Sequence, residues 1–160
     1  MTDFPKVPLK LLSKIERENV DPSEMGSEKV SLHSIPGFDD GQNPELINPS
    51  LIKSAKTRVS RDSVLISLLN PRISRVEKVC AGSYCFPEFA AVTPNQSLDI
   101  SFLYYALQTL EMQEWLVIHA EGSTRSRTRT NREYLRSGTI PLPDLETQRR
   151  IADYLDREIS

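Results

Sequence analysis

The C-terminal stretch, residues 138–160 (GTIPLPDLETQRRIADYLDREIS), constrains the fold more than any other part of the sequence. We expect a short extended run over 140–143, which Pro143 closes, and then a helix that Asp144 caps. Glu146 falls in the first turn, where the helix dipole favours negative charge. Residues at helical spacing then predict an amphipathic helix over 144–160. Its stripe consists of Leu145, Gln148, Ile151, Ala152, Leu155 and Ile159.

Length and composition favour one globular domain. A chain of 160 residues with 38% hydrophobic residues can bury a core of its own. No apolar run is long enough for a signal peptide or a membrane span. The only cysteines and histidines are Cys80, Cys85, His33 and His119, and they do not form a set of closely spaced zinc ligands. We therefore expect a soluble, cytoplasmic protein with reduced thiols and no metal site.

The charge distribution directs attention to local basic clusters. The formal net charge is −2, whereas proteins that coat nucleic acid indiscriminately usually carry a broad basic excess. The first cluster follows a dense apolar run over 64–69, which is short enough for a buried strand. A turn at 70–71 then leads to Arg72 and Arg75. Guanidinium groups on such a turn suit DNA phosphates and the acceptor edge of guanine, although ordinary surface arginines on a hairpin have the same pattern.

The second basic cluster follows Gly122, in the sequence STRSRTRTNREYLR. If residues 124–130 are extended, their period of two places arginines on one face and hydroxyl groups on the other. Both chemistries suit phosphates and base edges, whereas a helix would scatter the arginines around its axis. A mobile basic loop without a ligand is the alternative. Over both clusters, the predicted DNA-binding residues are Arg72, Arg75, Ser123, Thr124, Arg125, Ser126, Arg127 and Arg129.

Between these clusters the sequence predicts a mixture of short strands and helices. Strands are expected over 29–35 and 83–92, the second interrupted at Pro87. A helix capped by Asp99 is expected to run to about residue 112, with a second short helix over 114–120.

Two local features have a structural and a functional reading. Residues 36–44 have the composition of a loop, and we assign Asp39 and Asp40 within it to a solvated turn rather than to a metal site. His33, alone in a strand, is assigned a structural role.

Several segments, taken in order, resemble the specificity subunits of type I restriction-modification systems. They are the opening VPLK, the strand ending LNPR, the helix after Asp99, the glycine and arginine turn, and the closing IPLPDLETQRRIADYLD. The sequence departs from the family pattern at Asp144, commonly a second proline, and at Thr147, commonly glutamate. The resemblance implies an α+β fold, with a twisted mixed β-sheet and flanking helices in a target-recognition domain over 1–143. Residues 144–160 would then begin a coiled-coil spacer and dimerisation helix.

The resemblance also implies a non-catalytic function. The domain would read one half of a bipartite double-stranded DNA target and position methyltransferase and restriction subunits. S-adenosylmethionine, ATP and Mg would be bound by those partner subunits, and no cofactor by this chain. A second recognition domain, or a second copy of the chain, would pair through Gln148, Ile151, Ala152, Leu155 and Ile159. No membrane contact is implied.

Two alternatives remain open at this point. The chain could be a protein-assembly module that acts through its C-terminal helix, with the arginines serving only solubility. It could also be the recognition end of a fused DNA methyltransferase. We find no glycine-rich phosphate loop, methyltransferase motif or nuclease carboxylate set in the sequence, which argues against an enzyme.

Overall fold

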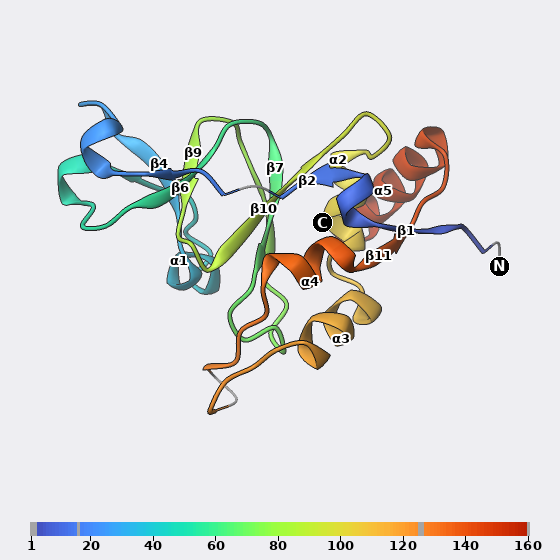
Figure 1. Ribbon diagram of the computed structural model, residues 1–160. Coiled ribbons are helices and arrows are strands. Elements are labelled where there is room, and N and C mark those ends of the chain that lie inside the picture. Colours follow the sequence, from blue (N-terminus) through green and yellow to red (C-terminus); the bar gives the residue numbers. More distant parts are fainter. Residues whose placement is uncertain (1–2, 16, 125–126, 160) are drawn as a thin grey trace.

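The computed structural model describes residues 3–15, 17–124 and 127–159. Within these ranges the strands form sheets of two, four and five strands, and helices flank them (Figure 1). The predicted α+β class with a mixed sheet, flanking helices and a C-terminal helix is confirmed.

The four-stranded sheet, in the order β2-β10-β7-β8, is the centre of the fold. All four strands run antiparallel to their neighbours, and Ala90 of β10 lies opposite Ile66 of β7. Every residue of β7 is buried, as its apolar run predicts for a strand covered on both faces. The four strands are β2 (Ser13–Lys14), β7 (Ser63–Ser67), β8 (Val76–Val79) and β10 (Phe89–Pro94).

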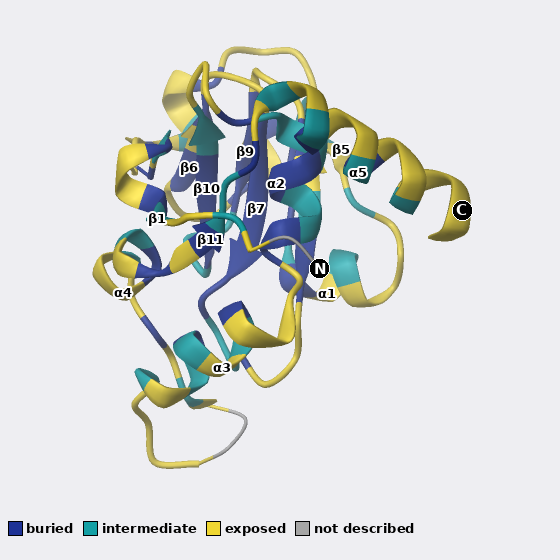
Figure 2. Cartoon of the chain, turned by 90° about the vertical axis from the view of Figure 1, so that its right-hand side faces the viewer, coloured by how far each residue is buried: buried dark blue, intermediate teal, exposed yellow. Residues whose placement is uncertain are grey.

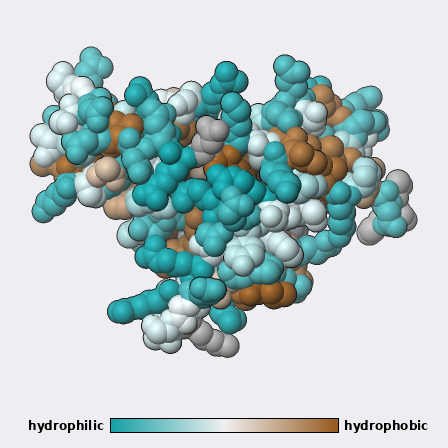
Figure 3. Space-filling view, viewed as in Figure 1, coloured by the Kyte–Doolittle hydropathy of each residue, from teal (hydrophilic) through white to brown (hydrophobic). Residues whose placement is uncertain are grey.

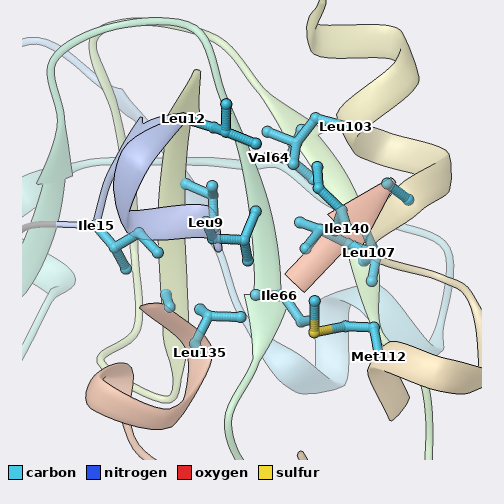
Figure 4. Close-up of a cluster of buried hydrophobic side chains, with 14 of the residues drawn as sticks. Leu9, Leu12, Ile15, Val64, Ile66, Leu103, Leu107, Met112, Leu135 and Ile140 are labelled. Atoms are coloured by element: carbon cyan, nitrogen blue, oxygen red, sulfur yellow. The ribbon is translucent and has the colours of Figure 1, made fainter. Parts of the chain in front are cut away.

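The two faces of this sheet supply separate hydrophobic clusters because successive strand residues point to opposite sides. Val64 and Ile66 join the larger cluster with Leu9, Leu103 and other side chains from the flanking helices (Figure 4). Leu65 points the other way, into a cluster with Val59 and Phe89. The central strands are therefore buried on both sides, as Figure 2 shows.

The five-stranded sheet has the order β3-β6-β9-β4-β5 and contains one parallel pair, β4 with β9. Its strands are β3 (Asn19–Val20), β4 (Val30–His33), β5 (Glu45–Ile47), β6 (Lys56–Val59) and β9 (Ser83–Cys85), with short 3-10 helices at η2 (Pro22–Glu24) and η3 (Pro49–Leu51). The strands predicted over 29–35 and 83–92 are confirmed, and the break at Pro87 separates β9 from β10.

The prediction that residues 36–44 are entirely loop is wrong. A short helix, α1 (Ile35–Asp39), begins there because the Ser34 hydroxyl accepts a hydrogen bond from the Gly37 amide and Pro36 occupies the first turn.

The prediction of one helix from Asp99 to about residue 112 is also wrong in its end point. Asp99 does cap α2 (Ile100–Ala106), accepting from the Phe102 amide at 3.0 Å. The helix stops there because Thr109 caps a new helix, α3 (Leu110–Ile118). Leu110, which would lie inside the single predicted helix, is instead 67% exposed at the start of α3.

The two ends of the domain meet in the two-stranded sheet. β1 (Lys6–Pro8) pairs antiparallel with β11 (Thr139–Pro141), and η1 (Leu9–Leu11) and α4 (Arg132–Ser137) lie beside this pair. Asp144 caps α5 (Leu145–Ile159) as predicted, accepting from the Thr147 amide at 2.8 Å. No helix among the described residues is long and apolar enough to cross a membrane.

Candidate nucleic-acid interface

The two basic segments, far apart in sequence, lie side by side in the structure. The Asn70 amide donates to the Thr128 carbonyl at 2.7 Å, and the Thr130 amide donates to the Leu68 carbonyl at 3.0 Å. Leu69 and Arg129 form an antiparallel bridge between these two hydrogen bonds. The loop after α3 is thus hydrogen-bonded to the end of β7, and the backbones of both segments lie at one end of the molecule (Figure 1).

The β7–β8 turn is held from within and from α3. Asn70 has a positive φ of 47°, and its carbonyl accepts from the Ile73 amide at 3.0 Å, which closes the turn. The Gln113 side chain of α3 donates to the Arg72 carbonyl at 2.6 Å. The turn that presents Arg72 is therefore fixed on two sides.

Arg72 and Arg75 differ in what they present to solvent. Arg72 is exposed and forms no ion pair with a described carboxylate. Arg75 is only 8% exposed, and its guanidinium donates to both carboxylate oxygens of Asp39 at 2.9 and 3.1 Å. This hydrogen bonding lowers the pKa of Asp39 below its ordinary value. In this conformation Arg75 fixes α1 to the central sheet instead of reaching outward.

The second basic segment forms a hairpin-like loop whose tip turns. Glu121 and Arg129 exchange backbone hydrogen bonds at 2.9 and 2.8 Å, so the extended prediction holds at Arg129. It does not hold at Arg127, whose amide donates to the Thr124 carbonyl at 3.1 Å, a bond that closes a turn. The predicted alternation of arginines and hydroxyl residues between two faces therefore does not hold along the whole segment.

The loop depends on a glycine at its start. Gly122 has φ 156°, and a Cβ atom at this position would lie 2.6 Å from the carbonyl oxygen of Arg127. That contact is with backbone, so the two sides of the loop approach this closely only because residue 122 has no side chain.

Most of the predicted contact residues of the loop are exposed. Ser123, Thr124, Arg127 and Arg129 are all exposed. Arg125 and Ser126, which the sequence also predicts to bind DNA, lie outside the described residues.

Aromatic side chains join the two ends of the loop. The His119 ring stacks on the Tyr134 ring with centroids 4.1 Å apart, and Trp115 lies edge-on to His119 at 4.3 Å. The Trp115 indole N–H also donates to the Tyr134 carbonyl at 2.7 Å. This contact between α3 and α4 sets the positions from which the loop leaves and returns. Trp115 thus anchors the packing of α3 against α4.

The predicted partner stripe of α5 divides into two groups. Gln148 and Ala152 are buried against the domain itself, at 0% and 1% exposure. The Gln148 side chain accepts from the Asp99 amide at 2.8 Å and donates to the carbonyls of Ser97 and Pro143, both at 2.9 Å. Ile151 and Leu155 are half-buried, and Ile159 is 68% exposed. Only these last three have surface free for another chain.

The histidine, cysteine and acidic side chains that the structure describes do not form a metal site. No group of three or more His, Cys, Asp or Glu side chains among the described residues could hold a metal ion. Burial raises the pKa of the Cys85 thiol to about 12, which keeps it protonated and unreactive. His33 is buried, with Nδ1 2.9 Å from a carboxylate oxygen of Glu77, in agreement with its predicted structural role.

An α+β scaffold that brings two arginine-bearing segments to one edge, with their backbones hydrogen-bonded together, has the features of a DNA-recognition domain. A model of the type I restriction modification DNA specificity domain family matches residues 43–160. The chain belongs to this family, whose members are non-catalytic specificity components. A comparison with curated protein sequences gives no match.

Solved structures show the same fold. One, described as the structural basis of complex assembly and conformational transition of the type I R-M system, has a TM-score of 0.81 and 21% identity over 99% of this chain and 43% of that one. The HsdS subunit from Thermoanaerobacter tengcongensis also has a TM-score of 0.81 and 21% identity, over 97% of this chain and 42% of that one. The S subunit from M. genitalium has a TM-score of 0.63 and 16% identity over 96% and 38%. This chain spans less than half the length of each.

Proposed function

We propose that this chain reads one half of a bipartite double-stranded DNA target through the edge formed by the β7–β8 turn and the loop over 121–130. The observation that carries this proposal is the backbone pairing of 68–70 with 128–130. Because that pairing fixes the two segments relative to each other, Arg72, Arg127 and Arg129 have a defined mutual arrangement, as base readout requires. The serine and threonine hydroxyls at 123–124 add donors for phosphates and base edges.

The proposal assigns different tasks to the predicted residues. Arg72, Arg127 and Arg129 contact DNA, together with Ser123 and Thr124. Arg75 instead positions the β7–β8 turn through its ion pair with Asp39. Arg125 and Ser126 keep the DNA-contact role that the sequence predicts for them.

The α5 helix supplies the second part of the proposed function. Ile151, Leu155 and Ile159 lie on the helix at i, i+4 and i+8 and retain exposed apolar surface. We propose that a helix of a second recognition domain, or of a second copy of this chain, packs on them. The recognition domain would thereby be placed relative to its counterpart and to methyltransferase and restriction subunits.

Replacing Arg127 with alanine tests base readout. If Arg127 pairs with a base edge, binding to the cognate duplex should weaken by about 1–3 kcal/mol and discrimination at one base-pair position should relax. The target is first identified by selection from a random duplex library, and affinities are then measured by fluorescence anisotropy on cognate and single-substitution duplexes.

Arg157→Ala is the matched control, because Arg157 is exposed in the last turn of α5, away from the proposed edge. It should leave both affinity and discrimination unchanged. Equal losses for Arg127→Ala on cognate and random duplexes would show a phosphate contact in place of base readout. An absence of sequence preference in the unsubstituted chain would reject the proposed function.

A further inference from the structure

A basic cleft lies on the face seen in Figure 1, outside the two paired segments. Its volume is about 760 Å³, and η1, β2, β10 and the β6–β7 connection line it. Hydrophilic side chains cover the centre of this face in Figure 3. The charged residues of the cleft are Lys10, Lys14, Arg17, Arg58, Arg61 and Glu18.

The cations of the cleft have free hydrogen-bonding capacity. All five are exposed, and neither Lys10, Lys14, Arg58 nor Arg61 forms a side-chain hydrogen bond or ion pair with any described residue. Arg17 uses one N–H on Asn19 at 2.9 Å. The carboxylate of Glu18 accepts from the Ser60 hydroxyl at 3.2 Å and forms no ion pair with a described cation, so five cations in the cleft face one acidic group. A concave surface with this imbalance concentrates a positive field.

The neutral polar groups of the cleft are already engaged within the chain. The Ser13 hydroxyl donates to the Leu9 carbonyl at 2.6 Å, and the hydroxyls of Ser63 and Thr93 are paired at 2.7 Å. The Asn95 side chain donates to the Leu11 carbonyl and accepts from the Ser97 amide. The groups left to bind a ligand are therefore the positively charged side chains, since the neutral donors and acceptors are already hydrogen-bonded within the chain. That chemistry suits a phosphodiester chain and carries no base specificity.

Contacts of α4 join the cleft to the edge proposed to read DNA. Arg17 lies close enough to Arg132 for their charges to interact, and the Arg136 guanidinium donates to the Ile15 carbonyl, close to Arg17 in the chain. Arg132 begins α4 directly after the second basic segment. Arg132 is partly buried and donates to the carbonyls of Pro87 and Phe89, so α4 connects the wall of the cleft to the second basic segment through fixed contacts.

We infer that this cleft binds the phosphate backbone of the same DNA duplex whose bases are read at the edge formed by 68–75 and 121–130. The inference rests on the proposed function. The cleft fixes the position of the domain on the duplex, and the loop reads the sequence. Because phosphate contacts are independent of sequence, the cleft contributes equally to binding of cognate and random DNA.

Charge removal on opposite walls of the cleft tests this inference. The variant carries Lys14→Gln on β2 and Arg61→Gln after β6, and the control carries Lys29→Gln and Lys53→Gln. Both control lysines are exposed beside the five-stranded sheet and do not line the cleft. The two variants have the same net charge. Binding of a fluorescent random-sequence duplex to the full chain is measured over a series of salt concentrations, and thermal unfolding verifies that both variants fold.

The cleft variant should bind random and cognate duplexes more weakly by the same factor. The slope of log K against log salt concentration should become shallower by about 0.9 for each phosphate that is no longer neutralised, or about two for the pair. The control should retain the slope of the unsubstituted chain. Arg127→Ala, measured alongside, should lose discrimination between sequences.

The outcomes separate the two proposals. If the cleft variant kept the original slope while Arg127→Ala lost discrimination, the cleft would be excluded and the proposed function would stand. If the control variant showed an equal change in the slope of log K against log salt concentration, the effect would come from net charge. Phosphate binding by the cleft would then be rejected. A full chain without salt-dependent binding to duplex DNA would overturn both.

Discussion

Two arginines three positions apart in one turn show how burial divides residues of the same type. Arg72 is exposed, whereas Arg75 is 8% exposed and is held by Asp39. The sequence places both on a basic turn but gives no sign of their different environments, because Asp39 belongs to a helix that the local composition did not predict. The local sequence identified the turn correctly, but only the contact with Asp39 distinguishes the buried Arg75 from the exposed Arg72.

Replacing Asp39 with asparagine should destabilise the fold. Arg75 would keep its buried position but lose its bidentate acceptor, at a cost of about 1 kcal/mol, near the low end of the usual range because Asp39 is partly exposed. Chemical denaturation at neutral pH measures the change in the free energy of unfolding. Asp40→Asn is the control, since Asp40 is exposed and has no side-chain ion pair with a described residue. Equal stability of the two variants would contradict this role for Asp39.

The same pair predicts a pH dependence. The hydrogen bond from Arg75 lowers the pKa of Asp39 in the folded chain below its ordinary value of 3.8. The contribution of Asp39 to stability is therefore fully present above that ordinary value and is lost as the pH falls through the lower, folded pKa. The stability difference between the unsubstituted chain and Asp39→Asn should shrink on acidification. Denaturation curves over an acidic pH series measure this difference, and a gap that widened in acid would contradict the assignment.

At the scale of single elements, α5 shows what helical periodicity can and cannot predict. The cap at Asp144 and the amphipathic pattern were predicted and are confirmed. Periodicity identifies an apolar stripe but not the surface that covers it. Gln148 and Ala152 are covered by the domain itself, and the surface left for a partner is smaller than the sequence suggested. The sequence did not predict the break between α2 and α3, because Leu103, Leu107 and Leu110 recur at helical spacing across it. The Thr109 cap is a local signal within that repeat.

Replacing Gln148 with leucine should detach α5 from the domain. The substitution leaves the Asp99 amide and the carbonyls of Ser97 and Pro143 without their side-chain partner, and each buried polar group left unpaired costs about 1–3 kcal/mol. Thermal and chemical unfolding measure the loss. Gln108→Leu is the matched control, because Gln108 is exposed and should change stability by less than about 0.5 kcal/mol. If Gln148→Leu were as stable as the control, the amide network would not hold α5 in place.

At the scale of the whole molecule, charge placement matters more than charge total. The net charge of −2 excluded a broadly basic surface, and the two arginine clusters were visible because each is local in sequence. Lys10, Lys14, Arg58 and Arg61 were not identified, since they come from separate segments that only the fold brings to one cleft. Their convergence depends on pairings between distant strands, such as β2 with β10, for which a single sequence contains no direct signal.

The predicted division between 1–143 and 144–160 also has a consequence for the whole molecule. Because Gln148 joins α5 to the start of α2, we propose that α5 is an integral part of the recognition domain as well as its connection to a partner. A chain that ends after Pro143 should unfold at a lower temperature and lose hydrogen-exchange protection in α2. A chain that ends after Asp156, which retains Gln148 and Ala152, is the control. Equal melting temperatures for the two truncated chains would support a boundary at residue 143.

The pairing of β1 with β11 determines the positions and directions of the two chain ends. Lys6 lies opposite Pro141, so the path into the fold and the path out of it run next to each other in opposite directions. The residues between the two strands therefore leave from and return to the same place in the fold, the β1–β11 pair. Replacing the residues between the two strands with a sequence of another length would leave the β1–β11 pairing, and therefore the directions in which the two chain ends leave the domain, unchanged.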